Sequence, residues 1–276
     1  RSLSGFVLVP RTNTPIVMHF NSTTEPLAPG GSDGGREQVR AAFRAWSRVA
    51  TTSFRFVEGS PTAAQGFNND SVNTVTFRDP DGDIPAPSGC SGVLAVGGMF
   101  FSTTPTMTVN GRQFSQAVEA DLVFADGWEA CTFLPDGGYY QSLSNLTEVA
   151  AHELGHTLGL GHSEASSVDA VSGLDGATME PFAHFDGRAA ILHADDKAGI
   201  TFIYPGRTLT IQKTGGGDGS ITSGTVGIDC GPDCVAGFAF NSTVTLTATP
   251  VAPATFQGFV EAGCGPTTVT MTSDKT

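Results

Sequence analysis

The spacing of apolar residues changes period along the chain and predicts a mixture of strands and helices. Between Gly35 and Ala50, apolar residues recur at Val39, Phe43 and Trp46, which is the spacing of an amphipathic helix. Short runs that alternate, or that are rich in β-branched and aromatic residues, predict strands. We expect these strands at 16–20, 54–57, 72–77, 92–97 and 119–124.

Two further helices are expected later in the chain. Asn145 is followed three residues later by Glu148, which is the pattern of a capping box and predicts the start of a helix. Residues 195–204 are expected to form the last helix. The order of elements predicts a mixed sheet with three helices, an α+β fold.

The composition of the chain changes after Pro205 and Gly206. Residues 207–276 are rich in threonine, valine and glycine and contain no histidine. Strands are expected at 209–212 and 244–248, with a glycine-rich turn at 215–219. We therefore expect two domains: a larger one of residues 1–206 and a small all-β domain of residues 207–276.

The net charge limits the classes of partner. The formal net charge of the 276 residues is −13, so nucleic acid and anionic membrane surfaces would repel the protein. No apolar run approaches the roughly 20 residues that a membrane-spanning helix needs. Residues 1–5 lack the apolar core of a signal peptide, so we expect a mature fragment.

The five cysteines point to an oxidising compartment. Cys230 and Cys234 flank a tight turn and are expected to form a local disulfide. The alternative is a C-x3-C half-site for zinc, which lacks a second pair of ligands. Cys90 and Cys131 could join two loops, and Cys264 is then left over. Together with the low lysine content, the cysteines favour a secreted, extracellular protein.

The segment from His152 to His162, H-E-L-G-H-T-L-G-L-G-H, carries the candidate chemistry. His152 and His156 are four residues apart and therefore lie on one face of a helix. Gly159 permits the turn that ends the helix, and this turn brings His162 back as a third metal ligand. Three imidazoles leave the fourth position of a Zn²⁺ ion open, as a catalytic zinc requires, and Glu153 is placed to act on a water there. A bare H-E-x-x-H could be a solvated helix face, but the added glycine and histidine favour a zinc site.

This segment resembles the zinc motif of the metzincin peptidases, and three further features resemble the matrixin family among them. Ser163 directly follows the third histidine, residues 177–181 (A-T-M-E-P) resemble the Met-turn, and residues 193–200 resemble the opening of the matrixin C-terminal helix. Because residue 181 is proline, the tyrosine that serves astacins as a fifth zinc ligand is missing. The resemblance covers roughly residues 5–206 and implies the metzincin fold, a twisted mixed sheet with three helices.

The resemblance implies a secreted zinc metalloendopeptidase that acts on protein or peptide substrates. Glu153 would accept a proton from the attacking water and return it to the departing amine. Met179 would support the metal from below without binding it. Val96 and Val123 stand where matrixins carry histidines of a second, structural zinc, so one catalytic zinc is expected.

The matrixin calcium loops are poorly matched. A Ca²⁺ site around Asp81 and Asp83 is therefore left open by the sequence. The histidines outside the motif, His19, His184 and His193, are expected to have structural or solvent-exposed roles.

Substrate is expected to bind as an added β-strand along residues 92–96, which resemble the matrixin edge strand. The resemblance also implies a pocket for the residue after the scissile bond, between Glu148 and an outer wall at 181–183. The Glu148 carboxylate would shorten this pocket or attract a basic or polar side chain. Alternatively it caps the helix together with Asn145, which local spacing favours. The candidate substrate-binding residues are Val93, Leu94, Ala95, Glu148, Val149, Pro181 and Phe182.

Residues 207–276 resemble a β-repeat module of secreted bacterial proteins. The resemblance rests on glycines ahead of the segment I-T-S, followed by the segments G-I-D-C and V-T-L-T-A. The resemblance implies that this module attaches the protein to a cell surface or matrix or acts as a spacer. A plain stabilising domain is an equally open alternative.

An adhesin or binding protein with a vestigial peptidase domain is the alternative to the peptidase, but the intact Glu153 argues against it. A zinc hydrolase of a non-peptide substrate is disfavoured by the strand-like edge.

Overall fold

The computed structural model describes residues 6–8 (backbone only), 15–23, 33–128, 131, 142–163, 176–184, 186–224, 227–260 and 267–276. The chain forms two compact units. The first contains Val17–Trp46 and Phe56–Ile203. The second contains Tyr204–Thr276 together with Ser47–Arg55. In the described part of the chain, no helix is both long and apolar enough to cross a membrane.

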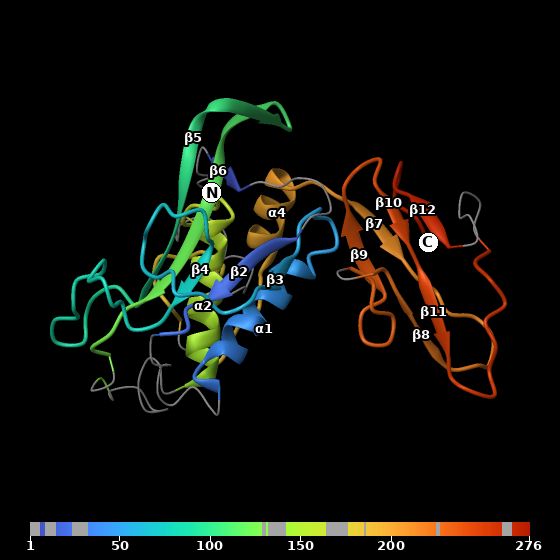
Figure 1. The fold of residues 1–276 in the computed structure, drawn as a ribbon, viewed down its shortest axis with the longest axis horizontal. Coiled ribbons are helices and arrows are strands. Elements are labelled where there is room, and N and C mark those ends of the chain that lie inside the picture. Colours follow the sequence, from blue (N-terminus) through green and yellow to red (C-terminus); the bar gives the residue numbers. More distant parts are fainter. Residues whose placement is uncertain are drawn as a thin grey trace. The chain divides into compact units, whose positions relative to one another are not determined.

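The first unit is built on a mixed sheet, which has six strands among the described residues (Figure 1). β6 lies at its centre and pairs in parallel with β1 and β4 and antiparallel with β5, while β2 pairs in parallel with β4 and lies next to β3. In this order β5 is an edge strand. The strands are β1 (Phe6–Leu8), β2 (Ile16–Phe20), β3 (Phe56–Glu58), β4 (Thr74–Thr76), β5 (Ala95–Val109) and β6 (Arg112–Phe124).

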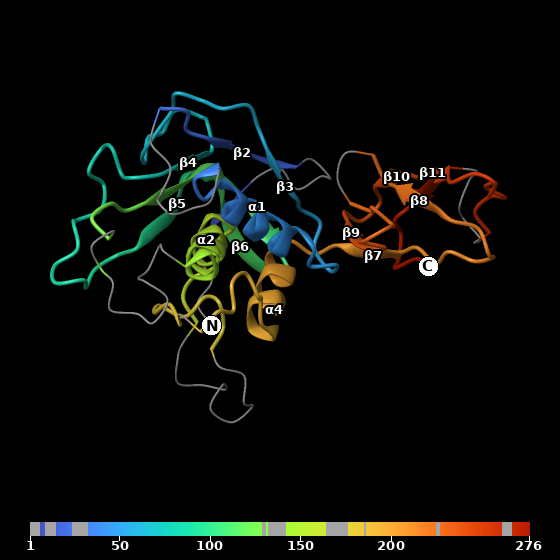
Figure 2. The same cartoon turned by 90° about the horizontal axis from the view of Figure 1, so that it is seen from below.

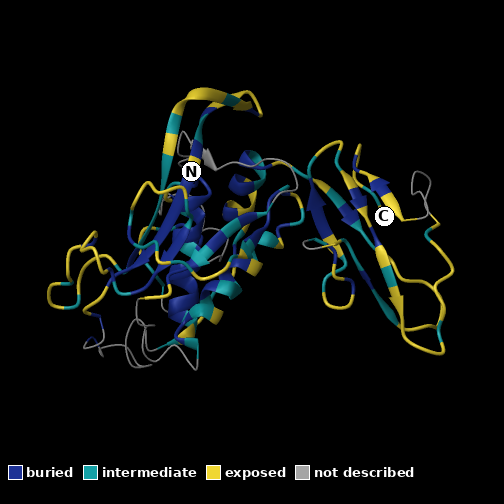
Figure 3. Cartoon of the chain, in the orientation of Figure 1, coloured by how far each residue is buried: buried dark blue, intermediate teal, exposed yellow. Residues whose placement is uncertain are grey.

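β5 and β6 form a hairpin that is much longer than the sequence predicted. The strands expected at 92–97 and 119–124 are only the inner ends of β5 and β6. The turn between them is Asn110-Gly111, and both residues have positive φ (48° and 78°), which suits the right-handed twist of a two-residue hairpin. The outer half of β5 is mostly exposed (Figure 3), so it lacks the apolar alternation that marks a half-buried strand.

Three helices are described, and they lie on one side of the sheet (Figure 2): α1 (Arg36–Ser47), α2 (Leu143–Thr157) and α4 (Ala194–Ile203). α1 buries Val39, Phe43 and Trp46, as its apolar spacing predicted. The indole nitrogen of Trp46 donates a hydrogen bond to the carbonyl of Ala151 at 2.8 Å and so ties α1 to α2. These elements bear out the metzincin-like arrangement of a mixed sheet with three helices.

The predicted start of α2 was wrong. The helix begins at Leu143 and its N-cap is Ser142, whose side chain accepts a hydrogen bond from the backbone of Asn145. Asn145 therefore lies inside the first turn and does not cap the helix. Serine and asparagine are both good N-cap residues, so local spacing alone could not choose between them.

Stacked aromatic rings join the helices to the sheet in the first unit. Phe20 on β2 lies 6.3 Å from Phe43 of α1 and 6.2 Å from Phe77, which follows β4. Phe77 in turn stacks on Phe124 at the end of β6, 5.1 Å away. Offset ring pairs at these separations add to the free energy of apolar burial, so this row fixes the sheet beneath the helices.

The second unit contains three two-stranded antiparallel sheets in its described part. Its apolar core includes Leu209, Ile221 and Phe238. The described residues also include the predicted Cys230–Cys234 disulfide, and the bonded sulfurs exclude the alternative zinc half-site. The pairs are β7 (Arg207–Thr210) with β9 (Val235–Phe238), β8 (Gly219–Thr222) with β11 (Thr247–Pro250), and β10 (Thr243–Thr245) with β12 (Thr268–Thr270).

The side chain of Arg55 connects the segment Ser47–Arg55 to β9 within this unit. Its guanidinium donates hydrogen bonds to the carbonyls of Phe54 (2.6 Å) and Gly237 (2.7 Å). Gly237 has no room for a side chain, because a Cβ would overlap the carbonyl oxygen of Thr52. The Cys90–Cys131 disulfide, also predicted, lies in the first unit, whereas Cys264 falls outside the described residues.

Candidate active site

Three histidines meet at the end of α2, as the motif predicted. His152 and His156 lie one turn apart on the helix, and Gly159, with φ of 91°, reverses the chain toward His162. The Nε2 atom of His156 lies 3.1 Å from Nε2 of His152 and 3.1 Å from Nε2 of His162. Among the described residues, this is the group of three histidine, cysteine or acidic side chains whose ligand atoms lie close enough to hold one metal ion.

Hydrogen bonds from Nδ1 orient two of the rings so that their Nε2 lone pairs point toward the centre of the histidine cluster. Nδ1 of His152 donates to the carbonyl of Thr178, and Nδ1 of His156 donates to the carbonyl of Leu160, each at 2.8 Å. Burial lowers the pKa of His152 to about 3 and also lowers the pKa values of His156 and His162. The imidazoles are therefore neutral, and their inward-facing nitrogens would repel one another without a cation between them.

The histidine cluster fits zinc. A tetrahedral zinc with Zn–N bonds of about 2.0–2.1 Å separates its nitrogens by roughly 3.3 Å. The two separations from Nε2 of His156, 3.1 Å each, are close to that value, and the three ligand atoms all lie within 4.8 Å of one another. Backbone carbonyls that accept from the other ring nitrogen are the usual outer partners of zinc-binding histidines. The three nitrogen donors and the backbone carbonyls that orient their rings thus both favour Zn²⁺.

Glu153 is buried next to the cluster and is oriented by the edge strand. The backbone N–H of Gly97 on β5 donates to its Oε2 at 2.6 Å, and its Oε1 lies 3.9 Å from Nε2 of His152. Burial raises the pKa of Glu153 to about 8, while the hydrogen bond from Gly97 lowers it. A raised pKa makes a carboxylate a better proton acceptor.

Gly97 was not identified as a site residue from the sequence. A Cβ at this position would overlap the backbone carbonyl of Glu153, so only glycine lets β5 approach α2 this closely. A glycine inside a predicted strand was the available signal.

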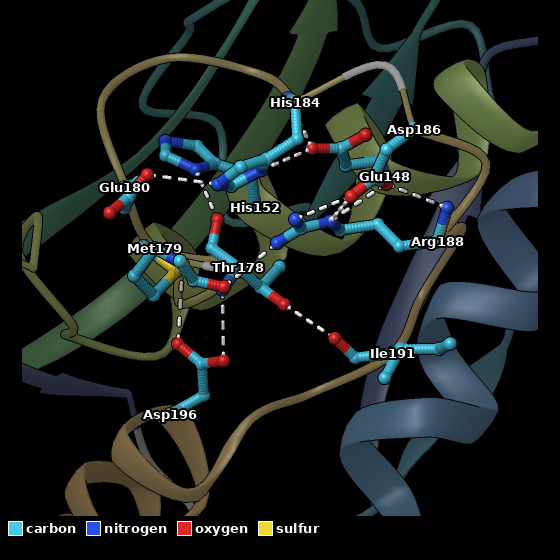
Figure 4. A network of polar contacts seen from close by, with 11 residues as sticks. Glu148, His152, Thr178, Met179, Glu180, His184, Asp186, Arg188, Ile191 and Asp196 are labelled. Atoms are coloured by element: carbon cyan, nitrogen blue, oxygen red, sulfur yellow. Dashed lines mark hydrogen bonds and ion pairs between the residues drawn. The ribbon is translucent and has the colours of Figure 1, made fainter. Parts of the chain in front are cut away.

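The segment that contains Met179 runs beneath His152, where the resemblance placed a Met-turn (Figure 4). Met179 is fully buried, and a Cβ on Gly155 of α2 would overlap its sulfur. The buried carboxylate of Asp196, in the first turn of α4, accepts hydrogen bonds from the backbone N–H groups of Thr178 (3.0 Å), Met179 (3.2 Å) and His193 (2.8 Å). Asp196 was missed because Thr178 and Met179, the partners that connect it to the segment beneath His152, are 18 and 17 residues away in the sequence.

The histidines and Glu153 face a cavity of about 820 Å³. The inner end of β5 and the segment after Met179 lie along it, and Phe182 is 81% exposed. The structure therefore brings together around one cavity every candidate substrate-binding residue, namely Val93, Leu94, Ala95, Glu148, Val149, Pro181 and Phe182.

A chain of hydrogen bonds lies at the Glu148 end of this cavity. The Glu148 carboxylate accepts from the backbone N–H (2.7 Å) and ring Nδ1 (2.8 Å) of His184. On its other side, Nε2 of His184 lies 2.9 Å from a carboxylate oxygen of Glu180. The expected capping box is thus replaced by a contact between α2 and the segment after Met179, and His184 has a structural role (Figure 4).

The other candidate metal positions have different environments. Val96 and Val123, which the resemblance aligned with histidines of a structural zinc, are paired across β5 and β6. Asp81 accepts hydrogen bonds from the side-chain amides of Gln65 and Asn68. The backbone N–H of Phe67 donates to Asp83. The structure leaves a calcium ion at these aspartates as open as the sequence does.

Comparisons with known proteins identify related sequences. The family model of the matrixins, peptidase family M10, matches residues 19–205. Metalloendoproteinase 1-MMP of Arabidopsis thaliana is 28% identical over 218 residues, which are 79% of this chain and 51% of that protein. The hatching enzyme of Paracentrotus lividus is 29% identical over 208 residues, 73% of this chain and 28% of that protein.

The chain thus spans about half, or less, of the length of these curated relatives. Among solved structures, high choriolytic enzyme 1, a hatching enzyme zinc-protease from the medaka fish Oryzias latipes, covers 69% of this chain and 88% of its own at 13% identity. Its TM-score of 0.30 is too low to carry an argument.

Proposed function

This chain belongs to the matrixin family, and from that premise we propose that it is a secreted zinc-dependent endopeptidase that hydrolyses peptide bonds of protein substrates. The observation that carries the proposal is the shared cavity: three metal-binding imidazoles, a buried carboxylate and an edge strand face the same space. A vestigial site would not need to keep Glu153 oriented by Gly97.

His152, His156 and His162 would hold the zinc. When bound, zinc supplies a Lewis acid that polarises the carbonyl of the scissile bond. Met179 supports the cluster from below, because Asp196 holds its backbone in place.

Glu153 is the proposed proton carrier. Its carboxylate accepts a proton from the water that attacks the scissile carbonyl, and then delivers this proton to the departing amine nitrogen. The N–H of Gly97 holds one carboxylate oxygen, so the other, Oε1, is directed toward the histidines. Burial excludes competing water from this pair and strengthens the interaction.

Substrate binds as an additional strand on the outer edge of β5. The carbonyl of Leu94 accepts a hydrogen bond from Ala125 on the β6 side, and Gly97 donates to Glu153 on the opposite side. Because successive residues of a strand point their backbone groups to opposite edges, Ala95 presents its N–H and C=O toward the cavity. Main-chain pairing there provides affinity with little demand on substrate sequence.

The side chain after the scissile bond lies between Glu148 and Val149 of α2 and the outer wall of Pro181 and Phe182. These residues line the same cavity. We infer that the apolar surface of the wall contributes to affinity and that Glu148 determines which side chains fit.

Residues 1–206 form the peptidase domain in this proposal, and residues 207–276 form a small β-rich module without a catalytic role. The second compact unit includes the latter residues. The module attaches the enzyme to a cell surface or matrix, or acts as a spacer. Extracellular secretion is consistent with the two disulfides.

The test is hydrolysis of fluorescently labelled casein and gelatin by the protein before and after metal removal. We expect activity that a strong chelator abolishes and that one equivalent of Zn²⁺ restores. No hydrolysis by a folded, zinc-loaded protein, together with binding to cells or matrix, would instead support the adhesin alternative.

A further inference from the structure

The second unit has its own cavity, of about 640 Å³, which shares no lining residue with the cavity of the candidate active site. Its lining is largely apolar: Ile221 of β8 and Leu246 are buried there, and Ala248 of β11 is half-buried. Phe256 and Phe259 also line it, with ring centroids 4.9 Å apart, and Phe256 is 43% exposed. A cavity of this size and composition is typical of a ligand site.

One edge of β7 already pairs with a parallel neighbour. The N–H of Lys275 donates to the carbonyl of Thr208, and the N–H of Thr210 donates to the carbonyl of Lys275, each at 2.8 Å. Leu209 lies between these residues and is paired with Ala236 of β9 on the other edge. The edge of β7 opposite β9 therefore accepts a strand in the parallel orientation.

The same edge continues past Thr210 along residues 211–214, which form no β-bridge with any described residue. The N–H of Ile211 donates to the carbonyl of Cys234, which directly precedes β9. Because successive residues of an extended chain direct their backbone groups to opposite edges, the N–H of Gln212 faces the side of Lys275. The carbonyl of Thr210 and the N–H of Gln212 are thus the next acceptor and donor on this edge, and both residues line the cavity.

We propose that this edge accepts an extended segment of a protein ligand as a parallel β-strand, and that alternate apolar side chains of that segment fill the cavity. Leu209 is buried and Ile211 packs against the apolar core, so this face of the strand is directed inward. A ligand residue level with Ile211 points its side chain the same way.

The chemistry of the cavity favours a polypeptide as the occupant. A strand supplies backbone partners at the spacing of Thr210 and Gln212, and it supplies apolar side chains for the buried lining. An oligosaccharide lacks the apolar side chains, and a lipid chain lacks the backbone donors and acceptors. A protein ligand with an exposed extended segment therefore fits both features.

The rim of the cavity is shaped without a ligand. A Cβ on Gly217 would lie 2.8 Å from the Cβ of Ala254, so glycine lets the turn at 215–219 approach this second lining segment closely. The inference rests on the attachment role proposed for residues 207–276, and no catalytic residue takes part in it. Main-chain pairing would provide the affinity, and the apolar cavity would select alternate side chains.

The test is binding of a fluorescently labelled nine-residue peptide that alternates threonine and valine between terminal lysines. Fluorescence anisotropy is measured with the full chain carrying Glu153→Gln, so that the peptide is not hydrolysed. Ala248→Phe adds a ring inside the cavity and is expected to weaken binding at least about tenfold. Thr247→Phe adds the same ring to the exposed face of β11, outside the cavity, and should bind like the parent.

A second pair of variants tests the backbone pairing. Gln212→Pro removes the N–H that would donate to the ligand, and we expect binding to weaken about tenfold. Gln212→Ala keeps this N–H and should bind like the parent. The peptide should also slow amide hydrogen exchange in residues 210–214 of the parent and of Gln212→Ala, measured by mass spectrometry, but not in Ala248→Phe.

Equal affinities of the parent, Ala248→Phe and Gln212→Pro, or unchanged exchange in residues 210–214 of the parent, would overturn the proposal. Protection of these residues by self-association of the chain would also overturn it, because the edge would then belong to a second copy. Hydrolysis is measured separately: with Glu153 present, Ala248→Phe should cleave a short peptide as fast as wild type. An absence of hydrolysis in both, together with the expected binding order, would contradict the peptidase and leave the strand site supported.

Discussion

Asp196, beneath the histidine cluster, and Asp121, in the centre of the sheet, are both buried aspartates, yet their surroundings differ. Asp196 accepts three backbone hydrogen bonds, from Thr178, Met179 and His193. Asp121 accepts from the N–H and hydroxyl of Thr74 through one oxygen only, and its Oδ2 has no hydrogen-bond partner among the described residues. Burial raises the pKa of Asp121 to about 7.

The difference shows how the same side chain can stabilise one region and destabilise another. A carboxylate with several donors recovers the cost of leaving water, and at Asp196 it also fixes the segment beneath the metal site. A carboxylate with an unpaired oxygen does not recover that cost. The second unit offers a third case, Arg55, whose buried charge is satisfied by backbone carbonyls.

Breaking the contacts of Asp196 should have the largest effect on stability. In Asp196→Asn one acceptor oxygen becomes an NH₂ group that faces backbone N–H donors. We expect a loss of about 3 kcal/mol in the free energy of unfolding, measured by urea denaturation, together with weaker zinc binding in competition with a chelator.

Asp195→Asn is the matched control for Asp196→Asn. Asp195 accepts a hydrogen bond from the hydroxyl of Ser163, which an amide oxygen can still accept. An Asp196→Asn variant as stable as the control, with unchanged zinc affinity, would show that this aspartate does not hold the Met-turn.

Removing the buried charge in the second unit should have an intermediate effect. Arg55→Met keeps most of the side-chain volume but leaves the carbonyls of Phe54 and Gly237 without their donor. We expect the protein to lose about 2 kcal/mol of stability. The zinc content of the folded variant, measured by mass spectrometry, should not change, because the histidines lie in the other unit. Loss of zinc from this variant would connect the two units energetically.

Asp121→Asn should have the smallest effect and the opposite sign. The pKa of Asp121 is higher in the folded protein than the usual 3.8 of an unfolded chain, so the folded protein binds more protons between about pH 4 and 7. The part of the free energy of unfolding that comes from this proton uptake is therefore lost as the pH rises from about 4 to 7. We expect the variant to gain on the order of 2 kcal/mol at pH 8 and much less at pH 4.

Urea unfolding at both pH values checks this pattern, with the exposed Asp126→Asn as control. An equal effect of Asp121→Asn at pH 4 and pH 8 would mean that Asp121 does not titrate with a raised pKa.

The histidine cluster could be predicted from the sequence because its geometry is local. A spacing of four residues places His152 and His156 on one helix face, and a glycine at 159 permits the turn to His162. The family resemblance added the segment of Met179 and the wall of the cavity, which lie around the same space. Nothing beyond eleven consecutive residues was needed to predict the metal ligands.

The contacts that support the cluster could not be predicted, because they join segments that are distant in sequence. Gly97 and Glu153 are 56 residues apart, and Glu148 and His184 are 36 residues apart. Local spacing favoured a capping role for Glu148, and the tertiary contact with His184 replaced it. The outer half of β5 was missed for a different reason: both its faces are largely exposed, so it shows no apolar alternation.

Comparison of wild type with Glu153→Gln tests the central claim most directly. The glutamine keeps the size of the side chain and an acceptor for Gly97 but cannot carry a proton. We expect one zinc per chain in both proteins, by mass spectrometry, and a decrease of about 10³-fold in kcat/KM for a cleaved peptide. A variant that keeps its zinc and hydrolyses the peptide within tenfold of wild type would contradict the account.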